Sequence, residues 1–289
     1  MNLTEYSYKN FKFIGNSEGG IHTCIAVPQF RLLFDTGVGS TRLADYPLIL
    51  LSHGHLDHAA GIVYLVSQRS LRKQSPPDIY APPEIVEPLD KIMKLWGEIE
   101  GYQSPYQLHS IDYEMIYPLK GNFFFKAVRS FHRVPSNGYT IVEKTQKLKP
   151  EFLNLPGREI AKRKFNGEKL FDDLLQPVIT FSGDTTIEFV TQNPIVQQSR
   201  ILFLECTYIC AKRTIERARE WGHIHLDEIV ANAESFRNIE HLFLIHFSQR
   251  YGRREIEETL KQKLPNWLYS KTTPFLTLRD QETNKKKVK

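Results

Sequence analysis

Cysteine is scarce in this sequence of 289 residues, which contains only Cys24, Cys206 and Cys210. An odd number of cysteines without regular spacing is not a disulfide framework, so we expect reduced thiols in a cytoplasmic protein. An organellar location is the alternative for a eukaryotic source. Cys206 and Cys210 have the chemistry of metal ligands, although a free cysteine more often packs as a small apolar side chain.

Long apolar runs are also absent, since none approaches the ~20 residues that a membrane-spanning helix requires. The N-terminal stretch MNLTEYSYKN lacks the pattern of a secretory signal. We therefore expect no membrane partner. The formal net charge is +5 at pH 7, and this mild basic excess permits a polyanionic partner such as nucleic acid without requiring one.

What the sequence does contain is a dense cluster of ligand-type residues in the stretch LSHGHLDH, residues 51–58. It places His53, His55, Asp57 and His58 between a predicted strand and a predicted helix. Alternation along the extended part sends His53 and His55 to the same side of the chain. Imidazoles and a carboxylate together suit zinc or a similar divalent metal. The alternative is a solvated polar turn, and the density of ligand types favours the metal site.

Ligand-type residues also follow other predicted strands along the chain. These strand ends deliver Asp35, His53, His132, Asp184, Glu205 and His246. Sheet-based enzymes build their sites from such residues along one edge of a sheet. Strands and helices alternate here, but several strands follow one another like hairpins. The order predicts an α+β fold, an αββα sandwich in which two mixed sheets pack face to face with helices outside. We expect one domain over residues 1–289.

A helix predicted from Pro83 to Trp96 carries an apolar stripe. The stripe consists of Ile85, Val86, Leu89, Ile92, Met93 and Trp96. Because these positions recur at helical spacing, we expect all of them on the inner face of the helix.

Residues 143–176 change the character of the chain, because lysine and arginine crowd there with apolar residues such as Phe165 between them. Charge runs of this kind are most often a solvated face. The alternative is an inserted arm that grips phosphates of a nucleic acid. In that case Lys162, Arg163 and Lys164 are candidate RNA-binding residues.

The order HxHxDH, then His132, Asp184 and His246, resembles the metallo-β-lactamase superfamily. Three segments narrow the resemblance to ribonuclease Z, the tRNA 3′-end endonuclease. They are FHRVPSNGYTI at 131–141, GHIHLDEIV at 222–230 and LIHFSQRY at 244–251. The short, plant-type form of that enzyme also carries SHxHxDH and a GHIH segment.

Two features depart from the family pattern. Many bacterial ribonuclease Z sequences read HLHGDH, and Leu56 stands here in place of that glycine. The long Gly-Pro-containing arm of those enzymes is not evident, and the shorter basic segment 143–176 occupies its place between His132 and Asp184. The second departure concerns how a tRNA is held and whether a full tRNA is the substrate.

The resemblance implies two Zn²⁺ ions per subunit, with Mn²⁺ as the alternative metal. It assigns one ion to His53, His55 and His132, the second to Asp57, His58 and His246, and a bridging role to Asp184. Seven nitrogen and oxygen ligands are a plausible supply for two ions ~3.5–4 Å apart. A water activated between the ions would attack the phosphodiester, which leaves a 3′-hydroxyl and a 5′-phosphate. Asp57 therefore also counts among the catalytic residues.

The resemblance further implies that His223 donates a proton to the leaving oxygen and that Glu205 is its carboxylate partner. From the residues alone, Glu205 is equally a strand-end carboxylate in a salt bridge, and His223 and His225 are indistinguishable. Asp35 either caps a turn or accepts a hydrogen bond from a metal-bound histidine. Arg250 either contacts a phosphate oxygen or forms a surface ion pair.

The expected function is that of a zinc-dependent endoribonuclease that removes 3′ trailers from precursor tRNA. The alternative is a small-molecule phosphodiesterase or another hydrolase on the same dinuclear metal scaffold, because this fold hosts many chemistries. The family likeness also implies a homodimer in which the arm of one subunit holds tRNA for the site of the other.

Overall fold

The computed structural model describes residues 3–277, and these form two seven-stranded sheets in which neighbouring strands follow chain order. The first sheet contains β1 (Thr4–Tyr8), β2 (Phe11–Glu18), β3 (His22–Val27), β4 (Leu32–Phe34), β5 (Leu48–Leu50), β6 (Asp78–Ala81) and β7 (Gln107–Ser110). The second contains β8 (Tyr117–Lys120), β9 (Phe123–Arg129), β10 (Asn137–Leu148), β11 (Phe171–Phe181), β12 (Ile201–Glu205), β13 (His241–Ile245) and β14 (Thr272–Pro274). In both, the first four strands pair antiparallel and the last three add in parallel, so the predicted mixed sheets are confirmed.

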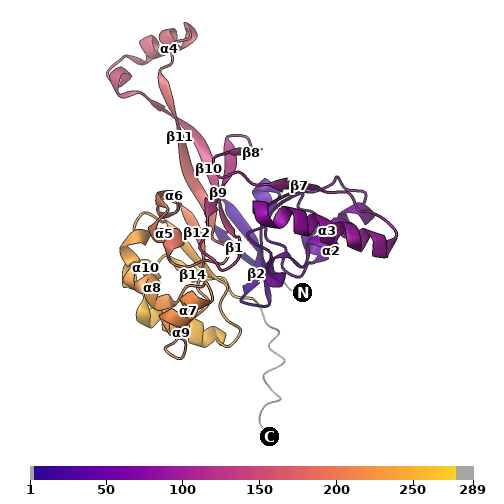
Figure 1. The fold of residues 1–289 in the computed structure, drawn as a ribbon. Helices are drawn as coiled ribbons and strands as arrows, with labels where there is room; N and C mark the ends of the chain where they lie inside the picture. Colours follow the sequence, from indigo (N-terminus) through magenta and orange to yellow (C-terminus); the bar gives the residue numbers. More distant parts are fainter. Residues whose placement is uncertain (1–2, 278–289) are drawn as a thin grey trace.

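Helices cover the outer faces of the two sheets (Figure 1). On the first sheet they are α1 (Leu56–Ala59), α2 (Ile62–Leu71) and α3 (Pro83–Glu100). On the second they are α5 (Glu188–Thr191), α6 (Pro194–Gln197), α7 (Ile215–Glu220), α8 (Leu226–Ala231), α9 (Arg253–Lys263) and α10 (Asn266–Tyr269). Short 3₁₀ helices are η1 (Pro28–Phe30), η2 (Thr41–Leu43), η3 (Pro150–Phe152) and η4 (Ala233–Phe236). The αββα sandwich is therefore confirmed. The single domain stays a prediction, because residues 1–2 and 278–289 lie outside the described residues.

Aromatic side chains from both sheets fill the core between them. Phe34 of β4 stacks on Phe181 of β11 with ring centroids 4.9 Å apart, and both rings are fully buried. Phe203 stacks on Phe243 at 4.7 Å on the same core face. Burying a side chain of this size contributes about 1.5–3 kcal/mol. These contacts fix the carboxyl ends of β4, β11, β12 and β13 relative to one another, which is where the candidate ligands lie.

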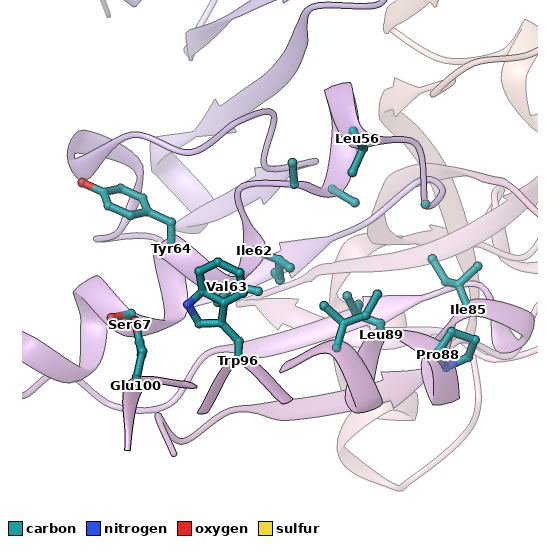
Figure 2. A pocket seen from close by; sticks show the side chains of 14 residues that line it. Leu56, Ile62, Val63, Tyr64, Ser67, Ile85, Pro88, Leu89, Trp96 and Glu100 are labelled. Atoms are coloured by element: carbon teal, nitrogen blue, oxygen red, sulfur yellow. The ribbon is translucent and has the colours of Figure 1, made fainter. Parts of the chain in front are cut away.

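Helix α3 corrects one expectation about burial. Leu89 and Met93 are buried as predicted, but Ile92 and Trp96 are 54% and 47% exposed, so their placement in the core is wrong. Trp96 and the Ile92 side chain instead line an apolar groove of about 570 Å³ that α3 forms with α1 and α2 (Figure 2). The apolar face of α3 is wider than the part of the sheet on which it packs. The apolar side chains at the edge of that face therefore remain exposed.

The basic segment 143–176 forms the outer part of a long hairpin. Strands β10 and β11 stay paired from Tyr139↔Phe181 out to Leu148↔Phe171. Helix α4 (Gly157–Phe165) lies at the tip, away from the sandwich (Figure 1). We call residues 143–176 the arm. Its backbone thus continues two strands of the sheet, whose apolar parts, 138–142 and 177–181, are all that the sequence pattern predicts as strand. Within residues 3–277, no helix has both the length and the apolar composition needed to cross a membrane.

Candidate metal centre

The strand ends of both sheets converge on one site. Parallel strands β4 and β5 end next to each other and lead into Asp35 and His53, respectively. Parallel strands β11, β12 and β13 lead into Asp184, Glu205 and His246 in the same way. Because the carboxyl ends of parallel strands share an edge, these side chains meet where the two sheets face each other.

One group of candidate ligands contains His53, His55, His132 and Asp184. Their nearest nitrogen and oxygen atoms all lie within 4.8 Å of one another. His55 Nδ1 lies 3.4 Å from His132 Nε2, and His53 Nε2 lies 3.7 Å from Asp184 Oδ2. The spacing leaves room for one cation between imidazoles that otherwise have no reason to face each other.

A second group contains Asp57, His58 and His246. His58 Nε2 and His246 Nε2 are 3.3 Å apart, and Asp57 Oδ2 lies 3.3 Å from His246 Nε2 and 3.5 Å from His58 Nε2. The three residues come from two separate places in the fold, since His246 follows β13 while Asp57 and His58 lie on α1.

Asp184 lies between the two groups. Its Oδ2 faces His53, while its Oδ1 lies 3.3 Å from both His58 Nε2 and His246 Nε2. Burial alone raises the pKa of this carboxyl. The positive charges of His246 and His58 outweigh burial and hold the pKa well below its usual range. The carboxylate is therefore ionised and able to serve both groups.

Two buried polar atoms of the site are left without a hydrogen bond from the protein. His53 Nε2 and Asp184 Oδ1 have no hydrogen-bond partner among the described residues. A buried polar atom without a partner costs about 1–3 kcal/mol. A divalent cation bound by imidazole nitrogens and carboxylate oxygens supplies the missing interaction, so the donor set fits zinc or a similar metal.

Each candidate histidine ligand that the fold buries is oriented through its other ring nitrogen. His58 Nδ1 donates to Asp35 Oδ2 at 2.6 Å, and the Ser52 amide and hydroxyl donate to the same carboxylate at 2.6 and 2.7 Å. Ser52 Oγ also lies 2.9 Å from His53 Nδ1. Of the two roles open to Asp35, its carboxylate thus takes the contact with a candidate metal ligand. Such contacts fix the ring orientation of metal-binding histidines.

The backbone holds His132 and His246 in comparable ways. His132 Nδ1 donates to the Gly222 carbonyl at 2.8 Å. Gly222 has φ +72°, and a Cβ there would lie 2.7 Å from His132 Nδ1, so only glycine permits this approach. His246 Nδ1 lies 2.9 Å from Thr207 Oγ1, and His246 itself adopts φ +61°, a conformation that non-glycine residues rarely take.

His223 lies beside the ligand groups and is paired with Glu205. Its Nδ1 donates to Glu205 Oε1 at 2.9 Å, and Glu205 is fully buried. Burial lowers the pKa of His223, but the charge of Glu205 and the hydrogen bond to it outweigh burial and raise that pKa to about 9. His225 instead accepts from the Asp227 amide at 3.1 Å as the N-cap of α8, so the structure distinguishes the two histidines.

Comparison with known proteins relates this chain to a named family. The chain is 34% identical over 253 residues to tRNase Z TRZ1 of Arabidopsis thaliana, across 87% of this chain and 90% of that protein. The chain belongs to the tRNase Z family. It is also 31% identical over 269 residues to the chloroplastic tRNase Z TRZ2 of the same plant, across 92% of this chain and 75% of that one. No family model matches the chain.

The fold of this tRNase Z family member resembles that of human tRNase Z, short form (ELAC1). The TM-score is 0.57 over 91% of this chain and 96% of that chain, at 18% identity. The metallo-β-lactamase fold protein YhfI of Bacillus subtilis matches with a TM-score of 0.59 over 90% of this chain and 92% of that one, at 16% identity. Both likenesses show the fold alone, and that fold is the one expected from the sequence.

The candidate RNA-binding residues are not gathered at the metal centre. Lys162, Arg163 and Lys164 lie on α4 at the tip of the arm (Figure 1). Arg163 is partly neutralised there, because it pairs with Glu159 at 3.0 Å and with Glu168 at 3.6 Å. These charged side chains of the arm are solvated, which agrees with the expectation that a charge run forms a solvated face.

The surroundings of Arg250, Cys206 and Cys210 distinguish between the roles that the sequence left open for them. Arg250 is exposed in the turn after His246, and no carboxylate of the described chain forms an ion pair with it. Cys206 is buried in the apolar core and Cys210 is half-buried. Neither cysteine joins a group of candidate ligands within residues 3–277, so packing rather than metal binding is their role there.

Three residues at the centre were not predicted from the sequence: Ser52, Thr207 and Gly222. Each lies next to, or two residues from, a predicted site residue. The available signal was this adjacency, because a side chain beside a ligand is placed to orient it. Serine, threonine and glycine are too common in turns for their identity alone to indicate such a role.

Proposed function

We propose that this protein is a zinc-dependent endoribonuclease that removes 3′ trailers from precursor tRNA. One observation carries the proposal: two groups of metal-ligand side chains share Asp184 and lie beside the His223–Glu205 pair. Membership of the tRNase Z family supports tRNA as the substrate. Neither a structural metal nor a simple binding protein needs an additional acid and a buried carboxylate partner for it.

The ligand assignment follows the two groups. His53, His55 and His132 would hold one Zn²⁺, and Asp57, His58 and His246 would hold a second, with Asp184 between them. Mn²⁺ is the alternative metal, because imidazole and carboxylate ligands accept both. When bound, such a pair of ions lowers the pKa of a shared water towards about 7 and neutralises charge on the phosphoryl oxygens.

The chain itself supplies the proton for the leaving group. Glu205 keeps His223 protonated at neutral pH, since it raises the pKa of that imidazole to about 9. His223 is positioned to give this proton to the ribose 3′-oxygen as the P–O bond breaks. The products are then a mature RNA with a 3′-hydroxyl and a trailer with a 5′-phosphate. Asp57 faces the opening of the site and is fixed by the Gly20 amide, which donates to its Oδ2 at 2.9 Å.

The arm and Arg250 are the proposed contacts to the RNA backbone. Lys162 and Lys164 have no ion pair with the described residues, and Phe165 at the end of α4 is 91% exposed. Cationic side chains beside an exposed aromatic ring suit phosphate binding with a stacking anchor. Arg250 lies next to the metal centre and suits a phosphate close to the cut.

A cleavage assay tests the proposal. Purified protein loaded with Zn²⁺ or Mn²⁺ is mixed with a 3′-extended precursor tRNA, and the products are mapped at single-nucleotide resolution. We expect one main cut near the discriminator base, with a 3′-hydroxyl on the tRNA. Hydrolysis of bis(p-nitrophenyl) phosphate by metal-loaded protein that leaves the precursor intact would favour the small-molecule hydrolase instead.

A second assay separates the RNA and small-molecule functions through the arm. In the variant Lys162→Gln/Lys164→Gln, affinity for precursor tRNA should fall and depend less steeply on salt. Hydrolysis of the small diester should be unchanged, because α4 lies at the tip of the arm, away from the sandwich (Figure 1). Unchanged RNA affinity would remove the arm from the proposal.

We further propose that the protein is a cytoplasmic homodimer, in which the arm of one subunit holds tRNA for the site of the other. The supporting observation is the exposed apolar face beside the groove of Figure 2, where Ile92, Leu95 and Ile99 are 54–74% exposed. An apolar face of this kind is typical of a protein interface. Light scattering should give twice the 33.7 kDa mass, and Ile92→Glu should reduce it to one chain.

A further inference from the structure

Trp221 lies at the rim of the metal centre and has no role in the mechanism described so far. It directly precedes Gly222, whose carbonyl holds His132, and it is two residues before His223. The turn at Gly222 fixes this position, because the His223 amide bonds back to the Ala218 carbonyl at 3.0 Å. Trp221 is nevertheless 42% exposed, so part of the side chain is open to a ligand.

Two arginines lie over this indole. The guanidinium of Arg133 lies over the ring with its Cζ 4.6 Å from the centroid, and that of Arg217 lies 5.4 Å from it. Arg217 is also held by Glu220 at 2.5 Å. Arg133 forms no ion pair with any carboxylate of residues 3–277, so its charge is available to a ligand. Arg133 directly follows His132, and its backbone amide packs against Gly222.

A half-exposed indole beside available guanidinium groups is suited to single-stranded nucleic acid. Bases stack on aromatic side chains with little regard to sequence, and arginine adds contacts to phosphate and to the π-face. A solvated tryptophan that only shields the Gly222 turn would need neither arginine. The arrangement therefore points to an unpaired nucleotide that lies next to the metal centre.

The position of His223 decides which nucleotide this is. His223 donates its proton to the 3′-oxygen that leaves, so the nucleotide that keeps this oxygen lies on the His223 side of the scissile phosphate. Trp221 and Arg133 flank the Gly222 turn, which leads directly into His223, and this proximity to the proton donor is the reason to assign them to the nucleotide that keeps the oxygen. The other side of the scissile phosphate holds the trailer.

We propose that Trp221 and Arg133 form a binding subsite for the nucleotide immediately 5′ of the scissile bond, the last nucleotide of the mature RNA. The indole stacks on its base, and the Arg133 guanidinium contacts its 5′-phosphate. The subsite rests on the proposed function, because it takes its direction from the proton donor. Stacking of the base at this one position therefore helps to determine which phosphodiester bond is cleaved.

A substrate with an abasic residue at this nucleotide tests the subsite directly. With the metal-loaded wild-type protein, the abasic precursor should lose about 5- to 150-fold in kcat/KM, the range that follows from losing one base stack. Trp221→Ala should lose a similar factor on the normal precursor, and should then cut the normal and abasic precursors equally well. Trp221→Phe keeps a stacking ring and should recover most of the loss.

Arg133→Ala should weaken precursor binding and lower the slope of log affinity against log salt by about 0.7, the value for one single-strand phosphate contact. Arg237→Ala is the matched control, because Arg237 lies 4.2 Å over Trp267 in an equivalent pair. That pair is at the opposite end of β13 from His246, where Lys271 contacts both the Trp267 ring and the Ile239 carbonyl. Arg237→Ala should leave kcat/KM and the salt slope unchanged.

Fluorescence gives a measurement that does not depend on a folded variant. A precursor with 2-aminopurine at the same nucleotide should be quenched when it is mixed with wild-type protein, before cleavage. Absence of quenching, or effects of Trp221→Ala and the abasic residue that simply multiply, would overturn the subsite while the wild-type cut stands. Failure of the wild-type protein to cut the normal precursor would instead overturn the proposed function, and the subsite with it.

Discussion

The hydroxyl of Thr207 lies 2.9 Å from Nδ1 of His246 and donates to Glu205 Oε2 at 2.8 Å. Since Glu205 Oε1 accepts from His223, a single hydroxyl connects a candidate metal ligand to the candidate acid. Thr207→Val has the same shape without the hydroxyl. We expect it to weaken metal binding by about 10- to 100-fold, the usual cost of losing a hydrogen bond that orients a metal-binding histidine.

Metal titration followed by activity on precursor tRNA measures this effect. Thr207→Ser keeps the hydroxyl and should recover metal affinity, which a loss of packing alone would not explain. Equal metal affinity in wild-type protein and Thr207→Val would show that the hydroxyl does not position His246.

Removing the shared carboxylate should separate metal binding from RNA binding. Asp184→Ala leaves His53, His58 and His246 without the charge that faces all three, so we expect at most one metal per chain and no measurable cleavage. Affinity for precursor tRNA should largely remain, because the proposed backbone contacts lie elsewhere. Elemental analysis and filter binding measure the two quantities.

His109→Ala is the matched control for this variant. His109 bonds to Asp78 at 2.8 Å and stacks on Tyr80, and it belongs to neither group of candidate ligands. It should keep both metal and activity. If Asp184→Ala fails to fold while His109→Ala folds, the carboxylate and its metals have a structural role, and the proposed catalytic role is not supported.

Glu205→Gln should slow the chemical step while it leaves the metals in place. Glutamine keeps the shape of a side chain that accepts from Thr185 and Thr207 as well as from His223, but it loses the charge. Without that charge, burial dominates the His223 environment and disfavours the protonated imidazole. We expect kcat to fall by about 10²- to 10⁴-fold, the usual contribution of a positioned acid.

Single-turnover rates and elemental analysis check the Glu205→Gln prediction together. A loss of metal in parallel with the loss of rate would mean that Glu205 supports the ligands through Thr207. A rate near that of the wild-type protein would exclude His223–Glu205 as the proton donor.

The sequence was sufficient for residues whose chemistry is unusual at their position. A histidine or aspartate at the end of a buried strand is rare unless it serves a site, so His53, Asp184 and His246 stood out, and parallel strand order then placed them together. The exposure of Ile92 and Trp96 could not be predicted. Helical spacing shows which residues share a face of the helix, but not how much of that face the rest of the fold covers. The length of β10 and β11 was missed for a related reason, since exposed strands beyond Val142 carry charged residues on both faces and have no apolar alternation.

Acid should destabilise the protein partly through His241, which lies far from the metal centre. This imidazole stacks on Tyr8 at 4.4 Å and contacts Phe243 at 4.5 Å, and burial lowers its pKa to about 4. The unfolded chain binds this proton near pH 6.5 and the folded chain only near pH 4, so stability falls as pH decreases between these values.

His241→Phe keeps the stacked ring and cannot be protonated. Between pH 7 and pH 4, its free energy of unfolding should fall by about 1–2 kcal/mol less than that of the wild-type protein, after allowance for solvent screening. Urea unfolding at each pH measures this difference, and metal release affects both proteins alike. Parallel pH curves for the two proteins would show that His241 is protonated equally easily in the folded and unfolded chain.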